Sequence, residues 1–270
     1  MRSAHRPASA GRGRRNELSQ VGAVPATAAA AMRGRLYFAP GAPAVDGRHS
    51  MSRTDAVRDA LLVVAAFALT YTGLGASGFT ASGVWAVIAS FGVATWRLHA
   101  AGEAWRDVGW RLPRSWPRML LATVVIFLIA MLLAGWFVGA LAQRLGWPPQ
   151  DFSRFAALRG DPVRLVLWLT VAWSTAAIGE ELVFRGFLMA RLLSAFGGSR
   201  AAGAAAVLVQ AALFGAGHAY LGVRGVAAAI AVGLVFGSAW LLNGRQLAPL
   251  VAAHGVIDTI SLLGIFAGRA

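Results

Sequence analysis

The sequence contains no cysteine, and its 25 basic residues are all arginine because lysine is absent. Without cysteine the chain can form no disulfide, thiolate zinc site or iron–sulfur cluster, and it cannot use a cysteine nucleophile. Any catalytic or metal-binding role must therefore fall to histidine, carboxylate or hydroxyl side chains. The missing lysine, together with an excess of alanine and glycine, is typical of a coding bias and carries no functional weight.

Charged residues are scarce as well. Only 13% of the 270 residues are charged, 57% are hydrophobic, and the mean hydropathy is +0.61. A soluble domain cannot bury so large an apolar fraction, so the composition predicts a polytopic membrane protein. Because the apolar runs have the length of helical spans, the expected fold class is all-α, a bundle of transmembrane helices.

The net charge of +14 does not indicate a nucleic-acid-binding protein. Ten of the arginines lie within the first 58 residues, and the others fall mainly between apolar runs. The chain also lacks aromatic residues interleaved with basic ones in a polar setting, which single-stranded nucleic acids require. The expected partner is the lipid bilayer, and we expect no nucleic acid.

The chain divides into a polar first part and an apolar remainder. Residues 1–55 are rich in Arg, Ala, Gly and Pro without sustained periodicity, which predicts a disordered basic tail. A mis-assigned start is the alternative for this segment, because Met32 and Met51 could each initiate the chain. Residues 56–270 are predicted to form a bundle of about seven transmembrane helices. The predicted spans are two within Ala60–Trp96, divided at the glycine-rich turn 73–78, then Met119–Ala142, Val163–Leu188, Ala204–Val223, Val226–Leu242 and Leu247–Ala267.

The distribution of arginine predicts the orientation of this bundle. Residues Arg97–Arg118 hold five arginines, so this connection and the N-terminus are expected in the cytosol. Four arginines in the 143–164 connection argue the other way. The alanine- and arginine-rich composition suggests a bacterial source, so the expected location is the bacterial inner (cytoplasmic) membrane.

Few ionisable residues fall inside the apolar runs. Glu180 and Glu181 lie side by side in the fourth span, although a carboxylate at the centre of a membrane helix costs about 2.5–3.5 kcal/mol. Glu181 and Arg185 are four residues apart and share a helix face, which predicts a supporting ion pair. Glu180 is turned about 100° away from Glu181. It is therefore the carboxylate without a local partner, as a general base requires.

The other intramembrane ionisable residues are histidines and an aspartate. His218 lies in the fifth span, and His254 and Asp258 share one face of the last span. Each has a structural interpretation by itself, such as a hydrogen bond from Ser261 to Asp258. Together with Glu180 they make up nearly all the intramembrane charge, which usually marks a functional site. We therefore predict that they converge on one water molecule or metal ion.

Three ordered motifs carry a family resemblance. They are Glu180-Glu181-x-x-x-Arg185, Phe214-x-x-x-His218 and His254-x-x-x-Asp258, and they lie on separate spans. They resemble the motifs of the CPBP (Abi) family of CAAX proteases and bacteriocin-processing membrane proteins, with residues 160–265 as the protease core. The resemblance implies an intramembrane metalloendopeptidase that cleaves a peptide or a membrane-associated protein.

The resemblance also implies catalytic roles. Glu180 would activate the attacking water together with His218, while His254 and Asp258 would hold the substrate carbonyl and its oxyanion. CAAX-cleaving members often have Asn at the last position. Because an ionised Asp cannot donate to an oxyanion, Asp258 is predicted to orient His254 or to ligate a metal. Glu180, His218, His254 and Asp258 also form a suitable donor set for Zn²⁺ or another divalent metal.

Alternative functions remain open at this point. Gly75-Ala76-Ser77-Gly78 resembles the nucleophile segment of rhomboid serine proteases, but it falls in a predicted turn. A non-enzymatic proton-coupled transporter, or an immunity or scaffold protein, could use the same Glu, His and Asp residues. The identity of the substrate cannot be read from the sequence.

The depths of the site residues lead to one more prediction. Counted along their helices, Glu180 and His218 reach the same level only if the fourth helix continues through Arg191 and the fifth begins later than Ala204. We therefore predict a long fourth helix and a site that opens towards the cytosolic half of the membrane.

Overall fold

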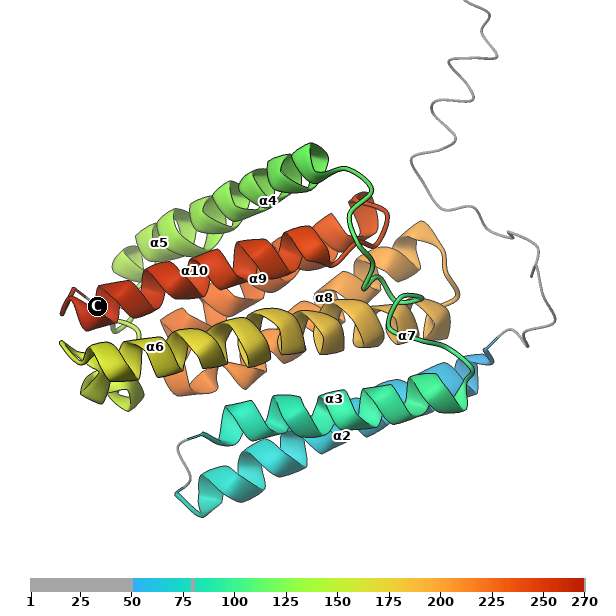
Figure 1. Ribbon diagram of the computed structural model, residues 1–270, viewed down its shortest axis with the longest axis horizontal. Helices are drawn as coiled ribbons and strands as arrows, with labels where there is room; N and C mark the ends of the chain where they lie inside the picture. The colour runs from blue at the N-terminus through green and yellow to red at the C-terminus, as the bar shows by residue number, and fades with distance from the viewer. Residues whose placement is uncertain (1–50, 79–80, 270) are drawn as a thin grey trace, which may run out of the picture. The chain divides into compact units, whose positions relative to one another are not determined.

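The computed structural model describes residues 51–78 and 81–269, which are helical throughout with short connections and contain no strand (Figure 1). The all-α prediction is therefore confirmed for this part of the chain. The tail predicted for residues 1–55 falls largely outside it, and the first described helix begins at Arg53. In chain order the helices are α2 (Arg53–Ala76), α3 (Ser82–Ala100), α4 (Trp116–Ala130), η1 (Met131–Phe137), α5 (Val138–Arg144), η2 (Ser153–Leu158), α6 (Pro162–Val171), η3 (Ala172–Leu188), α7 (Met189–Ala195), α8 (Arg200–Gly217), η4 (Ala219–Leu221), α9 (Gly222–Leu242) and α10 (Ala248–Phe266).

Six helices in the described part of the chain are long and apolar enough to cross a membrane. The expected turn near residues 73–78 separates α2 from α3. Helix α3 has 19 residues but is not among the six, because it ends with Arg97 and His99. The prediction of about seven spans therefore corresponds to seven membrane-length segments, of which six meet the length and hydropathy of a span.

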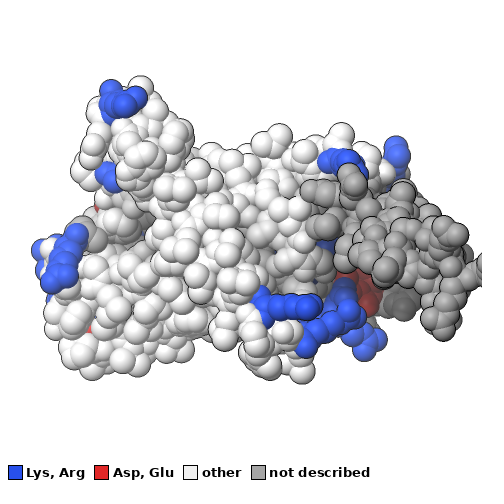
Figure 2. All heavy atoms as spheres, turned by 90° about the horizontal axis from the view of Figure 1, so that it is seen from above, with Lys and Arg blue, Asp and Glu red and all other residues white. Residues whose placement is uncertain are grey.

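On the face shown in Figure 2, charged side chains gather towards two ends with an uncharged surface between them.

Local sequence signals set where the helices begin. Asp161 accepts a hydrogen bond from the backbone N–H of Arg164 (3.0 Å), and Pro162 occupies the first turn of α6. Ser199 caps α8 in the same way through the N–H of Ala202 (3.1 Å). These caps satisfy N–H groups that have no partner within the helix, and proline is tolerated there because its missing N–H is not needed.

The segments α6, η3 and α7 form one continuous helix, residues 162–195, in the middle of the bundle. Helix α3 packs on one side of η3 and α10 on another, while α2 contacts α7 (Figure 1). The predicted long fourth helix is confirmed, because it continues through Arg191 to Ala195. The predicted late start of the fifth helix is wrong. A connection of only four residues leads to α8, which begins at Arg200.

Helices α8 and α9 pack closely through small residues. A Cβ added to Gly233 would lie 2.8 Å from the Cα of Ala211, so only glycine fits at this position. The side-chain amide of Gln210 donates to the carbonyl oxygen of Gly233 (2.9 Å), and Gln210 is fully buried. The Gly233-x-x-x-Gly237 motif therefore serves helix packing, as is usual in membrane bundles.

A group of ion pairs holds the α2–α3 hairpin against the long central helix. We call Asp59, Arg97, Glu103 and Arg191 the hairpin cluster. Asp59 is fully buried and accepts from Arg97 Nε (2.8 Å) and from Arg191 Nε (3.2 Å), one bond on each carboxylate oxygen. Arg191 also donates to Glu103 (2.7 Å). Four separate parts of the chain are joined here, and both oxygens of the buried carboxylate are paired.

Candidate active site

The Glu180-Glu181 pair lies in η3, a segment of π-helix 17 residues long within the central helix. A π-helix has i→i+5 hydrogen bonds, and such segments are rare and frequent at functional sites. Glu181 and Arg185 lie on a fully buried face, and their side chains form the predicted ion pair (2.8 Å). The side chain of Glu180 lies on another face and is 16% exposed, which is enough for its carboxylate to reach a cavity.

Glu181 has a second partner that the sequence analysis missed. Its Oε1 accepts from Arg185 (2.8 Å) and also from Nδ1 of His254 (2.8 Å), 73 residues further along the chain. Because an ionised carboxylate only accepts, the proton of this bond resides on Nδ1 of His254. Glu181 therefore fixes the ring orientation of His254, in addition to its structural pairing with Arg185.

Aromatic rings surround the charged side chain of Arg185. Its guanidinium lies over the ring of Phe214 (4.1 Å to the centroid) and over Phe236 (5.3 Å). Cation–π contacts of this kind stabilise a buried cation that has only one anionic partner. Phe214 also packs against the rings of His218 and His254. The first residue of the second motif therefore connects all three motifs.

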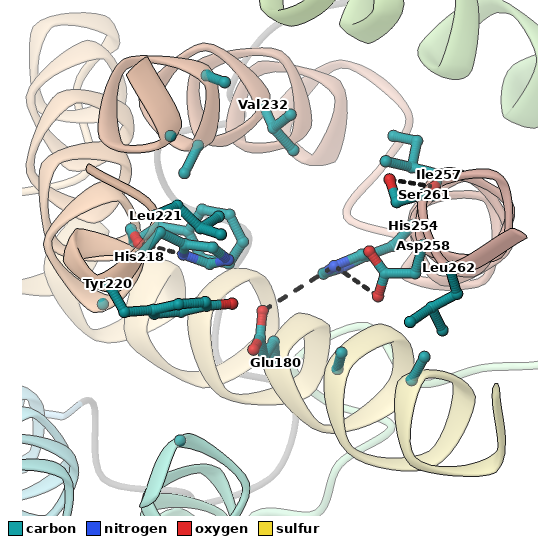
Figure 3. A pocket seen from close by; sticks show the side chains of 18 of the residues that line it. Glu180, His218, Tyr220, Leu221, Val232, His254, Ile257, Asp258, Ser261 and Leu262 are labelled. Atoms are coloured by element: carbon teal, nitrogen blue, oxygen red, sulfur yellow. Dashed lines mark hydrogen bonds and ion pairs between the residues drawn. The ribbon is translucent and has the colours of Figure 1, made fainter. Parts of the chain in front are cut away.

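The remaining face of His254 points towards two carboxylates. Its Nε2 lies 4.0 Å from Oε2 of Glu180 and 3.6 Å from Oδ2 of Asp258 (Figure 3). Glu180 Oε2 is buried and has no hydrogen-bond partner among the described residues. Asp258 and Glu181 therefore contact opposite nitrogens of the His254 ring, and the two roles predicted for Asp258 stay predictions.

His218 occupies the C-cap of α8. Its Nδ1 donates to the carbonyl oxygen of Phe214 (2.8 Å), which leaves Nε2 available in the cavity. Within the described residues no hydrogen bond or ion pair joins His218 to Glu180. The structure therefore brings Glu180, His254 and Asp258 together, with His218 further along the same cavity (Figure 3).

The four predicted catalytic residues line one cavity of about 460 Å³. A fifth polar residue, Tyr220, lies among them and was missed. Its ring stacks on His218 (6.1 Å between centroids, 25° between planes), and its hydroxyl points towards Glu180 (Figure 3). Its position two residues after His218 could have indicated that Tyr220 belongs to the site. A tyrosine near the end of a membrane helix is equally typical of the membrane interface, so the position alone was not sufficient. Most of the remaining lining is apolar.

The cavity extends to one end of the bundle. Gln150, Arg154 and Leu221 line it, and they lie in connections at the end where α10 finishes. The arginine-rich connection between α3 and α4 lies at the other end (Figure 1). The orientation of the N-terminus and the opening of the site towards the cytosolic half both stay predictions.

The donor atoms of this site do not fit a metal ion as they are placed. No group of three or more His, Asp or Glu side chains in residues 51–78 and 81–269 could hold one. Within the described residues His218 forms no hydrogen bond or ion pair with Glu180 or Asp258, so it stands apart from the other possible ligands. The metal site stays a prediction, and the reaction proposed below is written without it.

Ser77 has a local structural role. It caps the end of α2, where its hydroxyl donates to the carbonyl oxygen of Leu74 (2.7 Å), and it does not line the cavity. The rhomboid-like interpretation of this segment therefore has no support in the described residues.

The fold and the site define a class of protein: a helical membrane protein with polar, ionisable side chains around a cavity between its helices. Residues 162–260 match the family described as type II CAAX prenyl endopeptidase Rce1-like. This match confirms the resemblance inferred from the three motifs, and it supports the general activity of a peptidase. Neither the curated proteins nor the solved structures gave a match.

Proposed function

We propose that this chain is an intramembrane endopeptidase that hydrolyses a peptide bond with a water molecule activated by Glu180. One observation carries the proposal. Oε2 of Glu180 is buried without a hydrogen-bond partner among the described residues, borders the cavity and lies 4.0 Å from Nε2 of His254. A buried carboxylate with an unpaired oxygen is costly, and such a cost is retained where the group performs chemistry.

Water held between Glu180 and His254 would be the nucleophile. The two acceptor atoms are too far apart for a direct hydrogen bond but close enough for one water to contact both. Glu180 takes a proton from this water as the carbon–oxygen bond forms, and later gives it to the leaving amine as the carbon–nitrogen bond breaks. The products are a carboxylate and an amine.

The rest of the cavity suggests the kind of substrate. Its walls carry the side chains of Phe67, Val84, Val87, Met131 and Trp168, which are apolar and come from four different segments. Such a lining suits an apolar peptide segment or a lipid-modified one. The family description names CAAX prenyl substrates. We therefore propose a membrane-associated peptide or protein, with a prenylated CAAX peptide as the first substrate to test.

The test is hydrolysis by protein purified in detergent and reconstituted in lipid nanodiscs. Fluorogenic peptides with a farnesylated CAAX end, their unmodified counterparts and a mixed peptide library would be compared. Wild type is expected to cleave at least one, and Glu180→Gln and His254→Ala are expected to abolish turnover. Glu103→Gln, in the hairpin cluster, is the matched control and should keep it. Equal activity of Glu180→Gln and wild type would reject the proposal and favour the non-enzymatic alternatives.

A further inference from the structure

A peptidase that attacks a peptide bond with an activated water needs a hydrogen-bond donor at the substrate carbonyl. The inference below therefore depends on the proposed function. When water attacks, the carbonyl oxygen becomes an oxyanion. Donors placed at that oxygen are a large contribution to catalysis, and removing one typically lowers kcat by about 10²–10³-fold.

None of the four motif residues in the cavity supplies one in its ordinary form. Ionised Glu180 and Asp258 accept only. Neutral His254 carries its proton on Nδ1, which donates to Glu181, so its Nε2 is an acceptor. Neutral His218 is in the same state, because its Nδ1 donates to the carbonyl oxygen of Phe214. A proton on Nε2 of a charged His254 would face Glu180 and Asp258.

Three other hydroxyl groups lie on the cavity wall, those of Tyr71, Thr175 and Ser261, and the last two are already engaged. Thr175 donates to the carbonyl oxygen of Val171 (2.7 Å), and Ser261 donates to that of Ile257 (3.0 Å). Both are bonds from a side chain to the preceding turn of its own helix, which keeps the hydroxyl hydrogen away from the cavity.

Tyr220 differs from these groups in position and in chemistry. Its hydroxyl has no hydrogen-bond partner among the described residues and points towards Glu180 across the cavity (Figure 3). A phenol with an ordinary pKa of about 10 is neutral at pH 7 and can donate.

Contacts on the aromatic ring hold Tyr220 in this position. The ring stacks on His218, and the guanidinium of Arg154 lies 5.0 Å from its centroid. The short 3₁₀ turn Ala219–Leu221 places the residue one turn beyond α8. Gly222 follows with φ 76°, a backbone conformation that favours glycine.

We propose that Tyr220 is a further catalytic residue, whose hydroxyl donates to the carbonyl oxygen of the scissile bond and to the oxyanion formed from it. In the first step water loses a proton to Glu180, its oxygen bonds to the carbonyl carbon, and the carbonyl electron pair moves to oxygen. In the second step this pair returns, the carbon–nitrogen bond breaks and the amine takes the proton from Glu180. Tyr220 keeps its own proton throughout and supplies the donor that Asp258 cannot.

The test is the kinetics of Tyr220→Phe, with Tyr71→Phe as the matched control. Tyr71 also lines the cavity, but from α2, where it stacks on Phe67. Both variants lose one hydroxyl from the cavity wall. With the fluorogenic CAAX peptide, Tyr220→Phe is expected to lower kcat by about 10²–10³-fold with KM within about two-fold. Tyr71→Phe is expected to stay within about two-fold of wild type. Equal kcat for Tyr220→Phe and wild type would overturn the inference, as would an equal loss in both variants.

A second readout separates catalysis from a purely structural effect. A phosphinic peptide of the same sequence carries a tetrahedral centre that mimics the oxyanion. Tyr220→Phe should bind it more weakly by about the same factor as kcat falls, while melting temperature and elution volume stay as in wild type. Unchanged binding of this peptide would contradict the role. Full activity of Glu180→Gln would instead reject the proposed function, so the two failures are distinguishable.

Discussion

The hairpin cluster and the site both bury carboxylates among helices, but they treat them differently. In the hairpin cluster each oxygen of Asp59 accepts from an arginine, at 2.8 and 3.2 Å. In the site, Glu181 accepts two hydrogen bonds through Oε1, although its Oε2 is buried without one. Within the described residues the carboxylate of the adjacent Glu180 accepts no hydrogen bond, and it borders a cavity. A paired buried carboxylate joins helices and an unpaired one is available to react. The difference separates structural charge from functional charge within one chain.

Glu180→Gln should give the largest effect on activity and the smallest on folding. Loss of a general base typically lowers the rate by about 10²–10⁴-fold. Stability should be unchanged or higher, because the substitution removes the charge from an oxygen that had no partner. Peptide hydrolysis and thermal unfolding of the same preparation check both parts. If the variant is unstable as well as inactive, the distinction between Glu180 and the paired Asp59 is lost.

Asp59→Asn should behave in the opposite way. It leaves Arg97 without its anionic partner and Arg191 with Glu103 alone, and breaking a buried ion pair from one side costs about 3–5 kcal/mol. Hydrolysis per folded molecule should stay near that of wild type, because the hairpin cluster lies outside the cavity. Unfolding in nanodiscs and active-site-normalised rates measure the two quantities. Normal stability would show that the ion pairs of the hairpin cluster contribute little.

Glu181→Gln should have effects on activity and stability that lie between those of Glu180→Gln and Asp59→Asn. The glutamine oxygen can still accept hydrogen bonds, but the charge that pairs with Arg185 and His254 is lost. We expect a stability loss of about 1–3 kcal/mol from the buried group left unsatisfied, together with a lower kcat. The measurement is unfolding combined with steady-state kinetics. Loss of stability with unchanged kcat would assign Glu181 to structure alone.

Removal of metal should give the smallest effect. Since the donor atoms around Glu180 and His254 are not arranged for an ion, treatment with a chelator is expected to change the hydrolysis rate by less than about two-fold. The comparison needs one sample assayed before chelation, after chelation and after addition of Zn²⁺. A loss on chelation that Zn²⁺ restores would show that the site rearranges around a metal.

Much of the fold could be predicted from the sequence because membrane helices have a strong local signal. The apolar runs identified every long helix, the glycine-rich segment before Gly78 located the first turn, and the four-residue spacing of Glu181 and Arg185 predicted their ion pair. These features depend on neighbours along the chain. The three motifs likewise identified Glu180, His218, His254 and Asp258, which all line the cavity.

What the sequence could not predict depends on contacts between distant segments. The bond from His254 to Glu181 spans 73 residues, and that from Arg191 to Asp59 spans 132. Spacing rules apply within one helix and say nothing about such pairs. The π-helical hydrogen bonding of η3 was missed because its composition is ordinary for a membrane helix. Tyr220 was missed because only the turn after α8 brings it into the cavity.

Hydrolysis in water enriched in ¹⁸O tests the central idea most directly. Mass spectrometry of the newly formed carboxyl end should show one ¹⁸O atom per cleavage with wild type. Glu180→Gln should release no product above background, while Glu103→Gln should match wild type. Labelled product formed by Glu180→Gln at the wild-type rate would contradict the account.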